Sequence, residues 1–359
     1  MSPSPLSRGA CPPFVWLVWG VYMNMLSTNI NKILIVKPSS LGDIVHSLPF
    51  LNVLKTCYPK AEIHWVIAKG LEGLLEGHQM IDRLWIIHKD MWKKITYARR
   101  TVKEIKLLLK ELKKEKYDLT VDLQGLLRSG IITKATGAPV RVGFHEAREG
   151  SRLFYTHKVK GGKDIHAVDR YLKIADYLGC DIKDVRFPFP SYSTYLPNPS
   201  LFSEDYAVII PGARWKTKVW PAEKFGKLAS KLSLKTVIVG SSGEIGAADT
   251  IIKLSQGKSI SLAGKSDLKE LVEVIRHAQF VVSNDSGPMH IAAALNIPVL
   301  AIFGPTESRR TGPYGDGHTI IRENVPCAPC FKKTCNDMKC MNDLSVEKVY
   351  KIIKKSKYM

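Results

Sequence analysis

Two phosphate-binding motifs that are common in nucleotide enzymes are missing from the sequence. Neither G-x-G-x-x-G nor G-x-x-x-x-G-K-S/T occurs in the 359 residues, which disfavours a nicotinamide dehydrogenase and a P-loop NTPase. Acidic residues are also scarce, because 33 Asp and Glu stand against 53 Lys and Arg and leave a formal charge of +20. This excess indicates an anionic partner, such as nucleic acid, nucleotide, phospholipid or a phosphorylated glycan. No aromatic and basic module or recognition helix is present, which argues against nucleic acid.

Cysteine is sparse outside one segment. Cys11, Cys57 and Cys180 are scattered, and a secreted disulfide scaffold would be shorter and richer in cysteine, so the composition favours a reducing cytosol. The other four residues follow the spacing C-x2-C-x4-C-x4-C, with a single C-x2-C where a zinc ribbon has two. Structural zinc, free surface thiols and a loop disulfide all remain open for Cys327, Cys330, Cys335 and Cys340.

No apolar run reaches the roughly twenty residues that span a bilayer. The longest, Phe14–Met23, is apolar except for Gly20 and the hydroxyl of Tyr22. It fits a signal peptide, a short anchor, or a non-native stretch before translation starts at Met25. No small-x-small cleavage pattern follows it, which argues against secretion. We therefore interpret residues 1–30 as an apolar N-terminal extension, and whether it is part of the native protein is open.

The remaining chain alternates between short apolar strands and helical patterns in two halves. A Pro- and Tyr-rich passage, Phe187–Pro199, separates them. This pattern predicts an α/β protein with two doubly wound, Rossmann-like domains that face each other across a cleft. We expect a first domain at 31–190, a linker at 191–204, a second domain at 205–345 and a basic C-terminal helix at 346–359. Predicted strands are 32–37, 62–68, 84–87, 119–123, 206–210, 236–239, 280–283 and 299–303, and predicted helices include 44–57, 89–116 and 221–232.

One strand-end turn in the first half is acidic. Asp43 follows the turn 37–42 and begins a helical pattern. A carboxylate there is either a helix cap or a general base that accepts a proton from an attacking hydroxyl in the cleft. Both interpretations are compatible with the spacing.

Three strand-end turns in the second half suit phosphate or ribose. Residues 284–290 open a helix whose free N–H groups could hold a diphosphate, with His290 as a further donor. Residues 211–221 place three cations, Arg214, Lys216 and Lys218, on another strand-end loop. Glu244 follows the strand predicted at 236–239, and its carboxylate could accept hydrogen bonds from ribose hydroxyls. The alternatives are a capped helix with a packed histidine, a solvated basic loop and an exposed acidic loop.

Taken together, these motifs resemble the lipopolysaccharide heptosyltransferases, the ADP-heptose-dependent glycosyltransferases of the GT-B fold. The resemblance covers about residues 31–350. Its motifs are VKPSSLGDIVHSLP (Val36–Pro49), VDLQGLLRSG (Val121–Gly130), GFHEARE (Gly143–Glu149), KVWP (Lys218–Pro221), SNDSGPMH (Ser283–His290) and FGPT (Phe303–Thr306). The first and third motifs are more similar to heptosyltransferase I, and the cysteine segment to heptosyltransferase II.

The resemblance implies a role for each matching residue. Asp43 matches the proposed catalytic base, and Ser39, Ser40 and Gly42 shape the turn around it. Arg128 and Arg148 fall in first-domain motifs that could meet the acidic acceptor, while the role of Arg214 is open. The positions that match donor binding are Lys218, Glu244, Asp285, Ser286, Gly287, Pro288 and His290.

The resemblance also implies an activity: inverting transfer of heptose from ADP-L-glycero-D-manno-heptose to Kdo of the lipid A–core precursor. Transfer to the first heptose, and a related GT-B transferase with another sugar nucleotide, are the alternatives. No cofactor or catalytic metal is expected. We expect a cytoplasmic monomer, peripheral on the inner membrane, because residues 89–116 carry eleven Lys and Arg against four Asp and Glu beside an apolar stripe. An ordinary amphipathic surface helix is the alternative for that segment.

Overall fold

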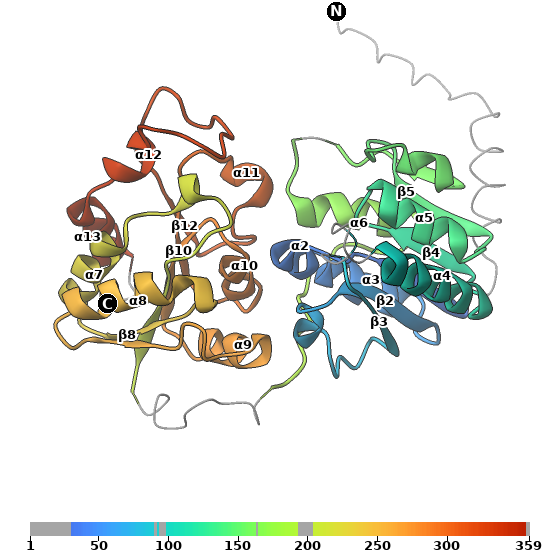
Figure 1. The fold of residues 1–359 in the computed structure, drawn as a ribbon, viewed down its shortest axis with the longest axis horizontal. Coiled ribbons are helices and arrows are strands. Elements are labelled where there is room, and N and C mark those ends of the chain that lie inside the picture. The colour runs from blue at the N-terminus through green and yellow to red at the C-terminus, as the bar shows by residue number, and fades with distance from the viewer. Residues whose placement is uncertain (1–29, 90–91, 93–97, 163, 193–203, 357–359) are drawn as a thin grey trace, which may run out of the picture.

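The computed structural model describes residues 30–89, 92, 98–162, 164–192 and 204–356. Within them the chain forms two α/β domains, each built on a six-stranded sheet with helices on both faces (Figure 1). This confirms the predicted pair of doubly wound domains. Nearly all of the proposed extension and most of the proposed linker lie outside the described residues.

The first sheet has the strand order β3-β2-β1-β4-β5-β6, and its neighbouring strands pair in parallel. β1 is central, and Ile33 through Val36 are completely buried because helices cover both faces. The strands are β1 (Lys32–Val36), β2 (Glu62–Ala68), β3 (Arg83–Ile87), β4 (Leu119–Asp122), β5 (Val140–Phe144) and β6 (His157–Val159).

The second sheet repeats this plan in the order β12-β11-β10-β7-β8-β9, again with parallel neighbours. The strand order reverses between β1 and β4 in one sheet and between β7 and β10 in the other. Ligands of doubly wound sheets bind beyond the carboxyl ends of strands at such points. The strands are β7 (Tyr206–Ile210), β8 (Lys235–Ile238), β9 (Ser259–Ser261), β10 (Phe280–Asn284), β11 (Val299–Ile302) and β12 (Thr319–Ile321).

Helices connect these strands. The first domain contains α2 (Leu41–His46), α3 (Leu48–Cys57), α4 (Ala98–Lys114), α5 (Leu127–Ala135) and α6 (Ala167–Tyr177). The second contains α7 (Ala222–Lys231), α8 (Ile245–Leu254), α9 (Leu268–Arg276), α10 (Gly287–Ala294), α11 (Ser308–Thr311), α12 (Lys339–Asn342) and α13 (Val346–Lys355). Short 3-10 turns are η1 (Glu72–Leu74), η4 (Ser151–Phe154), η7 (Lys216–Lys218) and η8 (Ser242–Glu244). The basic helix α13 buries Val349 and Ile353 in the second-domain core, so it is part of that domain.

The predicted helix 44–57 is wrong in its extent. The structure has two helices, α2 and α3, which are separated at Ser47. Pro49 lies in the first turn of α3 and has no N–H to continue the hydrogen-bond ladder of α2, so a break there is favourable. Because α2 begins at Leu41, Asp43 falls inside its first turn. Of the predicted helix 89–116, the structure describes α4, and residues 93–97 lie outside the described part.

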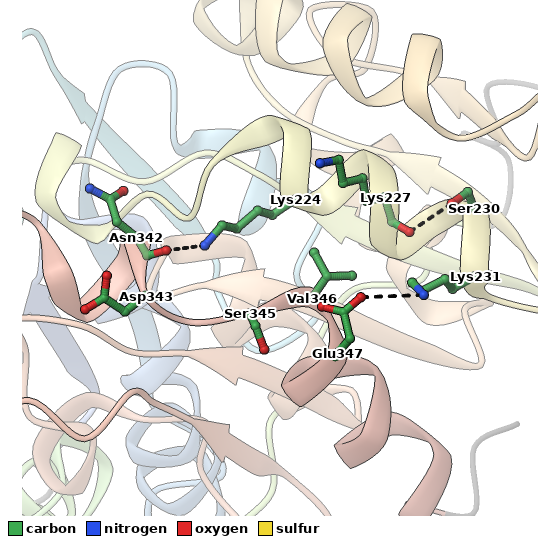
Figure 2. Close-up of a pocket in the computed structure, with 9 residues that line it drawn as sticks. All are labelled: Lys224, Lys227, Ser230, Lys231, Asn342, Asp343, Ser345, Val346 and Glu347. Atoms are coloured by element: carbon green, nitrogen blue, oxygen red, sulfur yellow. Dashed lines mark hydrogen bonds and ion pairs between the residues drawn. The ribbon is translucent and has the colours of Figure 1, made fainter.

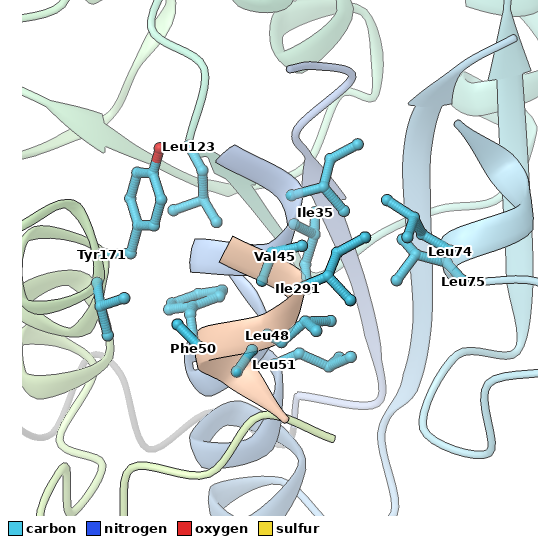
Figure 3. Close-up of a cluster of buried hydrophobic side chains, with 14 of the residues drawn as sticks. Ile35, Val45, Leu48, Phe50, Leu51, Leu74, Leu75, Leu123, Tyr171 and Ile291 are labelled. Carbon is cyan, nitrogen blue, oxygen red and sulfur yellow. The ribbon is translucent and has the colours of Figure 1, made fainter. Parts of the chain in front are cut away.

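The two domains meet through helices α2 and α10. A single buried apolar cluster includes Val45 and Leu48 from the first domain and Met289 and Ile291 from the second. Figure 3 shows Ile291 beside Val45 and Leu48. The apolar seam therefore fixes the relative position of two strand-end turns that are far apart in the sequence.

Glycines allow this close approach. A Cβ atom on Gly42 would lie 2.4 Å from Cδ2 of His290, and one on Gly287 would lie 2.8 Å from Cδ2 of Leu41. Real Cβ atoms do not come this close to other heavy atoms. Each turn thus contributes a glycine against which a side chain of the other domain packs.

Two of the scattered cysteines are paired. A disulfide joins Cys57 at the end of α3 to Cys180 after α6, with Cα atoms 5.5 Å apart. The sequence describes these cysteines only as scattered, and their separation of 123 residues gave no sign of the pairing. In the described ranges, no helix combines the length and apolar character needed to cross a bilayer.

Candidate active site

A cavity of about 260 Å³ lies between the two domains. It lies beyond the carboxyl ends of β1, β7 and β10, which is where ligands bind in doubly wound sheets. Its lining brings together eight residues with a role predicted from the sequence, Arg214, whose role was open, and three others. The lining residues are Ser40, Gly42, Asp43, His46, Arg214, Trp215, Lys218, Asp285, Ser286, Gly287, His290 and Thr311.

The two carboxylate oxygens of Asp43 have different surroundings. Oδ2 accepts hydrogen bonds of 2.8 Å from both the backbone N–H and the hydroxyl of Ser40, which caps helix α2. Oδ1 lies 3.4 Å from the hydroxyl of Tyr171 and 3.8 Å from Nζ of Lys37. The Asp43 side chain is 39% exposed. Asp43 is therefore both a helix cap, through one oxygen, and a candidate base, through the other.

Lys37 keeps this carboxylate ionised. Its side chain is only 3% exposed, and Nζ also lies 3.4 Å from the carbonyl oxygen of Leu123 and 5.1 Å from the centre of the Tyr171 ring. Burial alone would raise the pKa of Asp43, but the charge of Lys37 and the hydrogen bonds from Ser40 outweigh it, so this pKa lies below its ordinary value. For Lys37, burial lowers the pKa, but the charges of Asp43 and Asp122 and the interaction with Tyr171 together outweigh burial, so this pKa lies above its ordinary value.

On the second domain, Lys218 forms an ion pair with Asp285. Nζ lies 2.6 Å from Oδ2 of Asp285, and the same oxygen accepts a hydrogen bond of 2.6 Å from Thr306. Nζ is also 4.7 Å from the centre of the Trp215 ring. This buried aspartate and the aromatic ring hold the ammonium group at the cavity wall.

The segment after β10 supplies backbone donors. Ser286 is the N-cap of α10, but its side chain makes no capping hydrogen bond to the first turn. The first N–H groups of a helix have no partner within it, so this end of α10 can receive an anion. Just before it, the side chain of Asn284 accepts from Trp220 N and donates to Pro211 O. Asn284 thereby ties the Lys218 loop and the β7 strand-end loop to this helix terminus.

Comparison with known proteins is consistent with this geometry. The family model described as glycosyltransferase family 9 (heptosyltransferase) matches residues 105–341. The chain belongs to glycosyltransferase family 9. A curated member, lipopolysaccharide heptosyltransferase 1 of Pseudomonas aeruginosa, is 31% identical over 318 residues, covering 85% of this chain and 87% of that protein.

Solved structures of heptosyltransferases are also similar to this chain. The Escherichia coli heptosyltransferase WaaC with ADP has a TM-score of 0.76 and 26% identity, covering 90% of this chain and 99% of that one. WaaC with ADP-2-deoxy-2-fluoro heptose gives a TM-score of 0.75 at the same identity and coverage. The predicted GT-B fold and the predicted enzyme class are thus confirmed: this protein is a glycosyltransferase of the heptosyltransferase family.

Some proposed site residues of this family 9 enzyme lie outside the main cavity. Ser39 donates its N–H to Gln124 and, with Arg128, borders a smaller cavity of the first domain that also includes Trp92. Arg148 is exposed on the loop after β5. Pro288 lies in the first turn of α10 but does not line the cavity.

Glu244 also lies outside the lining. Its Oε2 accepts hydrogen bonds from the N–H and hydroxyl of Ser241, which makes it a cap of the turn after β8. Its side chain packs on Gly212 and Gly240, where added Cβ atoms would lie 2.8 and 2.9 Å from it. Glu244 is therefore positioned over the ends of β7 and β8, next to the loop that leads to Lys218.

The four-cysteine segment contains no disulfide in the structure. Cys327 and Cys335 are exposed, Cys330 is half-buried and Cys340 is buried, and all four are free thiols. Across the described part of the chain, no three His, Cys, Asp or Glu side chains are grouped to hold a metal ion. The loop disulfide is therefore not formed. The charges of Cys327, Cys330 and Cys335 add to the effect of burial in raising the pKa of the Cys340 thiol, so the four thiols lie in one neighbourhood, and structural zinc stays a prediction.

A second cavity, of about 470 Å³, lies between α7 and the segment 342–347 (Figure 2). None of the proposed site residues lines it. Two of its three lysines are already engaged, since Lys224 donates to Leu344 O at 2.8 Å and Lys231 lies 3.6 Å from Glu347. It is not a candidate for the reaction.

Several residues of the site were not predicted from the sequence. Lys37 directly follows the buried strand β1, and a lysine next to such an apolar run was the available signal. His46 follows Asp43 by three residues and so shares its helix face. Thr306 lies in a motif already quoted, after β11. Tyr171 gave no local signal, because only the packing of α6 brings it to Asp43.

Proposed function

We propose that this enzyme transfers heptose from ADP-L-glycero-D-manno-heptose to Kdo of the lipid A–core precursor, with inversion at the anomeric carbon. One observation carries the proposal: an ionised carboxylate of one domain, Asp43, and a cation of the other, Lys218, line the same cavity. The relative named heptosyltransferase 1 and the WaaC complexes with ADP and an ADP-heptose analogue support the donor and the reaction.

Asp43 acts as the general base. Its Oδ1 is free of the helix cap and takes the proton of the acceptor hydroxyl as the new bond to the anomeric carbon forms. The bond between that carbon and the β-phosphate oxygen breaks at the same time, and ADP leaves with the electron pair. Because base and diphosphate site belong to opposite walls, attack comes from the face opposite to ADP, which inverts the configuration.

The second domain offsets the charge of the departing ADP. Lys218, which Asp285 holds at the cavity wall, and the N–H groups at the start of α10 bind the diphosphate. Preorganised donors of this kind are each worth about 3–4 kcal/mol of barrier reduction. Glu244 binds the ribose from its place above the ends of β7 and β8. A cation and a helix terminus occupy the position that a divalent metal takes in other transferases, so we propose that no metal is needed.

The acceptor lies against the first domain. Burial is the largest cause that lowers the pKa of Arg170, and the charges of Arg310 and Arg148 lower it further, so the three side chains lie near one another. Arg148 and Arg170 belong to the first domain and Arg310 to the second, so this group combines cations of both domains. It suits the carboxylate and phosphate groups of the acceptor. Arg128, on the smaller cavity of the first domain, is a further candidate contact.

Helix α4 supports a peripheral position on the cytoplasmic face of the inner membrane. At about 100° per residue, its exposed lysines and two exposed apolar residues fall within one arc of about 140° that contains no acid. Val102 is 50% and Leu107 57% exposed on that arc. The lysines are Lys103, Lys106, Lys110, Lys113 and Lys114. A monomer suffices, because both walls of the cavity come from one chain.

The test is transfer by the purified protein. Incubation with ADP-heptose and Kdo₂-lipid A should add one heptose, as seen by mass spectrometry, and the mono-heptosylated acceptor should gain none. Gain on the mono-heptosylated form alone would favour the heptosyltransferase II alternative, and gain on neither would point to another sugar nucleotide or refute the assignment.

Variants test the residues. Asp43→Asn should reduce kcat by about 10²–10⁴-fold, while Asp249→Asn on the exposed face of α8 leaves it unchanged. Turnover of Asp43→Asn at the wild-type rate would refute the role of Asp43 as general base.

Membrane binding through α4 is tested by a triple variant. The Lys103→Glu, Lys106→Glu, Lys110→Glu variant should no longer sediment with phosphatidylglycerol vesicles. Equal sedimentation of variant and wild type would exclude α4 as the contact.

A further inference from the structure

His46 lines the cavity but has no part in the reaction described above. It ends helix α2, it is 3% exposed, and its ring faces the other domain. Its Nε2 lies 3.0 Å from Nδ1 of His290 on α10, and the ring centres are 4.2 Å apart in an edge-on arrangement. A hydrogen bond between two imidazole nitrogens uses one proton, so one ring donates and the other accepts.

Both rings are neutral at pH 7. Burial, followed by the charge of His290, holds the pKa of His46 well below its ordinary value. Burial also lowers the pKa of His290 to about 4, although the charge of Asp285 opposes it. Two tautomeric arrangements of the neutral pair are therefore available. The charged and titratable groups that face the pair from the packed elements are Lys37, Asp43, His166, Lys218 and Asp285.

The second nitrogen of His290 distinguishes the two arrangements. Its Nε2 faces the turn at Gly42, where an added Cβ would lie 3.0 Å away, and both residues line the cavity. If His290 donated through Nδ1, its Nε2 would present a lone pair toward the anionic leaving group. If His46 donates instead, Nε2 of His290 carries the proton and is a hydrogen-bond donor in the cavity.

We propose that His46 is a positioning residue: it donates Nε2–H to Nδ1 of His290 and so directs the Nε2–H of His290 toward the diphosphate. This inference rests on the proposed function. Since His46 belongs to the first domain and His290 to the second, the donor is set only when the two domains are together. The pair thus couples domain closure to stabilisation of the leaving group.

His166 supports this arrangement from the other side of His46. Its Nδ1 accepts the N–H of Val168 at 3.2 Å, so the proton must be on Nε2, which lies 3.1 Å from the carbonyl oxygen of Gly312. The hydrogen bond with Val168 lies within the first domain, and the hydrogen bond with Gly312 reaches the second domain. The His166 ring meets His46 edge-on with centres 5.0 Å apart. The His46 ring is therefore held between two rings, each of which is anchored to the second domain.

The first measurement is the tautomer of His290. Long-range ¹H–¹⁵N NMR spectra of the full-length protein with ¹⁵N-labelled histidine, saturated with ADP, distinguish a proton on Nε2 from one on Nδ1. The His290 signal is assigned by its loss in His290→Asn. We expect the Nε2–H form, and the Nδ1–H form would overturn the proposal. This readout needs no acceptor or turnover, so failure of the proposed transfer reaction would be seen separately.

Two variants test the consequence. His46→Gln keeps an N–H donor near the position of Nε2, and it should retain kcat within about threefold and the same His290 tautomer. His46→Leu removes the donor and should lower kcat by about 10- to 100-fold with little change in the KM for ADP-heptose. His64→Leu is the control for loss of a buried histidine, because His64 bonds Tyr117 away from the cavity. Wild-type kcat in His46→Leu, or an equal loss in His46→Gln, would refute the role.

Discussion

Gly42→Ala should separate donor binding from turnover in this enzyme. The added methyl group would lie 2.4 Å from Cδ2 of His290, whereas carbon atoms in contact prefer about 3.5–4.0 Å. The His290 ring is buried and bonded to His46, so it cannot swing away. Relief of the clash therefore requires α2 and α10 to move apart by about 1 Å.

This displacement would also move the Asp43 carboxylate relative to the second domain, because Asp43 follows Gly42 directly. A misplacement of about 1 Å commonly costs about 10²-fold in rate, and we expect kcat of Gly42→Ala to fall by that factor. ADP binding should change by less than about threefold, or about 0.7 kcal/mol, because the groups assigned to ADP belong to the second domain. The free energy of unfolding should fall by up to about 2 kcal/mol, because overpacking a buried seam costs about 1–3 kcal/mol and the higher helix propensity of Ala returns about 1 kcal/mol.

A matched control exists in the chain. Gly246 is the second residue of α8, as Gly42 is of α2, and a Cβ there would meet nothing within 4 Å. Gly246→Ala therefore makes the same helix change without the clash. Steady-state kinetics, ADP titration calorimetry and thermal unfolding of both variants form the assay. Wild-type kcat in Gly42→Ala, or an equal loss in Gly246→Ala, would refute the argument that this glycine permits domain closure.

Lys37→Met removes the cation 3.8 Å from Asp43, so the pKa of Asp43 should rise and the acidic limb of the kcat–pH profile should move to higher pH; an unmoved limb would contradict this. Lys218→Met should weaken ADP binding about 10- to 150-fold in calorimetry, as expected for one charged hydrogen bond of about 1.5–3 kcal/mol, and unchanged binding would remove Lys218 from the donor site. Because burial lowers the pKa of His290 from 6.5 to about 4, the unfolded chain binds its proton first, and the free energy of unfolding should fall as the pH drops through this interval. Urea titrations at several pH values measure that slope, which should be shallower in His290→Asn. Cys57→Ser should lower the free energy of unfolding by about 2–4 kcal/mol in oxidising buffer but not in reductant, and equal loss in both would exclude the disulfide as its cause.

Much of the site could be predicted because its motifs follow strands. Apolar runs such as 206–210 and 280–283 identify buried parallel strands, and the doubly wound arrangement places their carboxyl ends at one edge. Asp43, Lys218 and the turn 285–290 each follow such a strand, so local sequence was enough to nominate them. The break at Ser47 was missed because the apolar pattern continues through it, although Pro49 was available as a signal.

The sequence by itself determined the two sheets, the turns that end their strands and the residue types in those turns. Tertiary structure alone decided which turns meet. The contact of His46 with His290 joins residues 244 positions apart, and that of Tyr171 with Asp43 joins residues 128 apart. The same holds for the disulfide that joins Cys57 to Cys180. Propensity and periodicity act over a few residues, whereas these contacts depend on how whole helices pack across the domain seam.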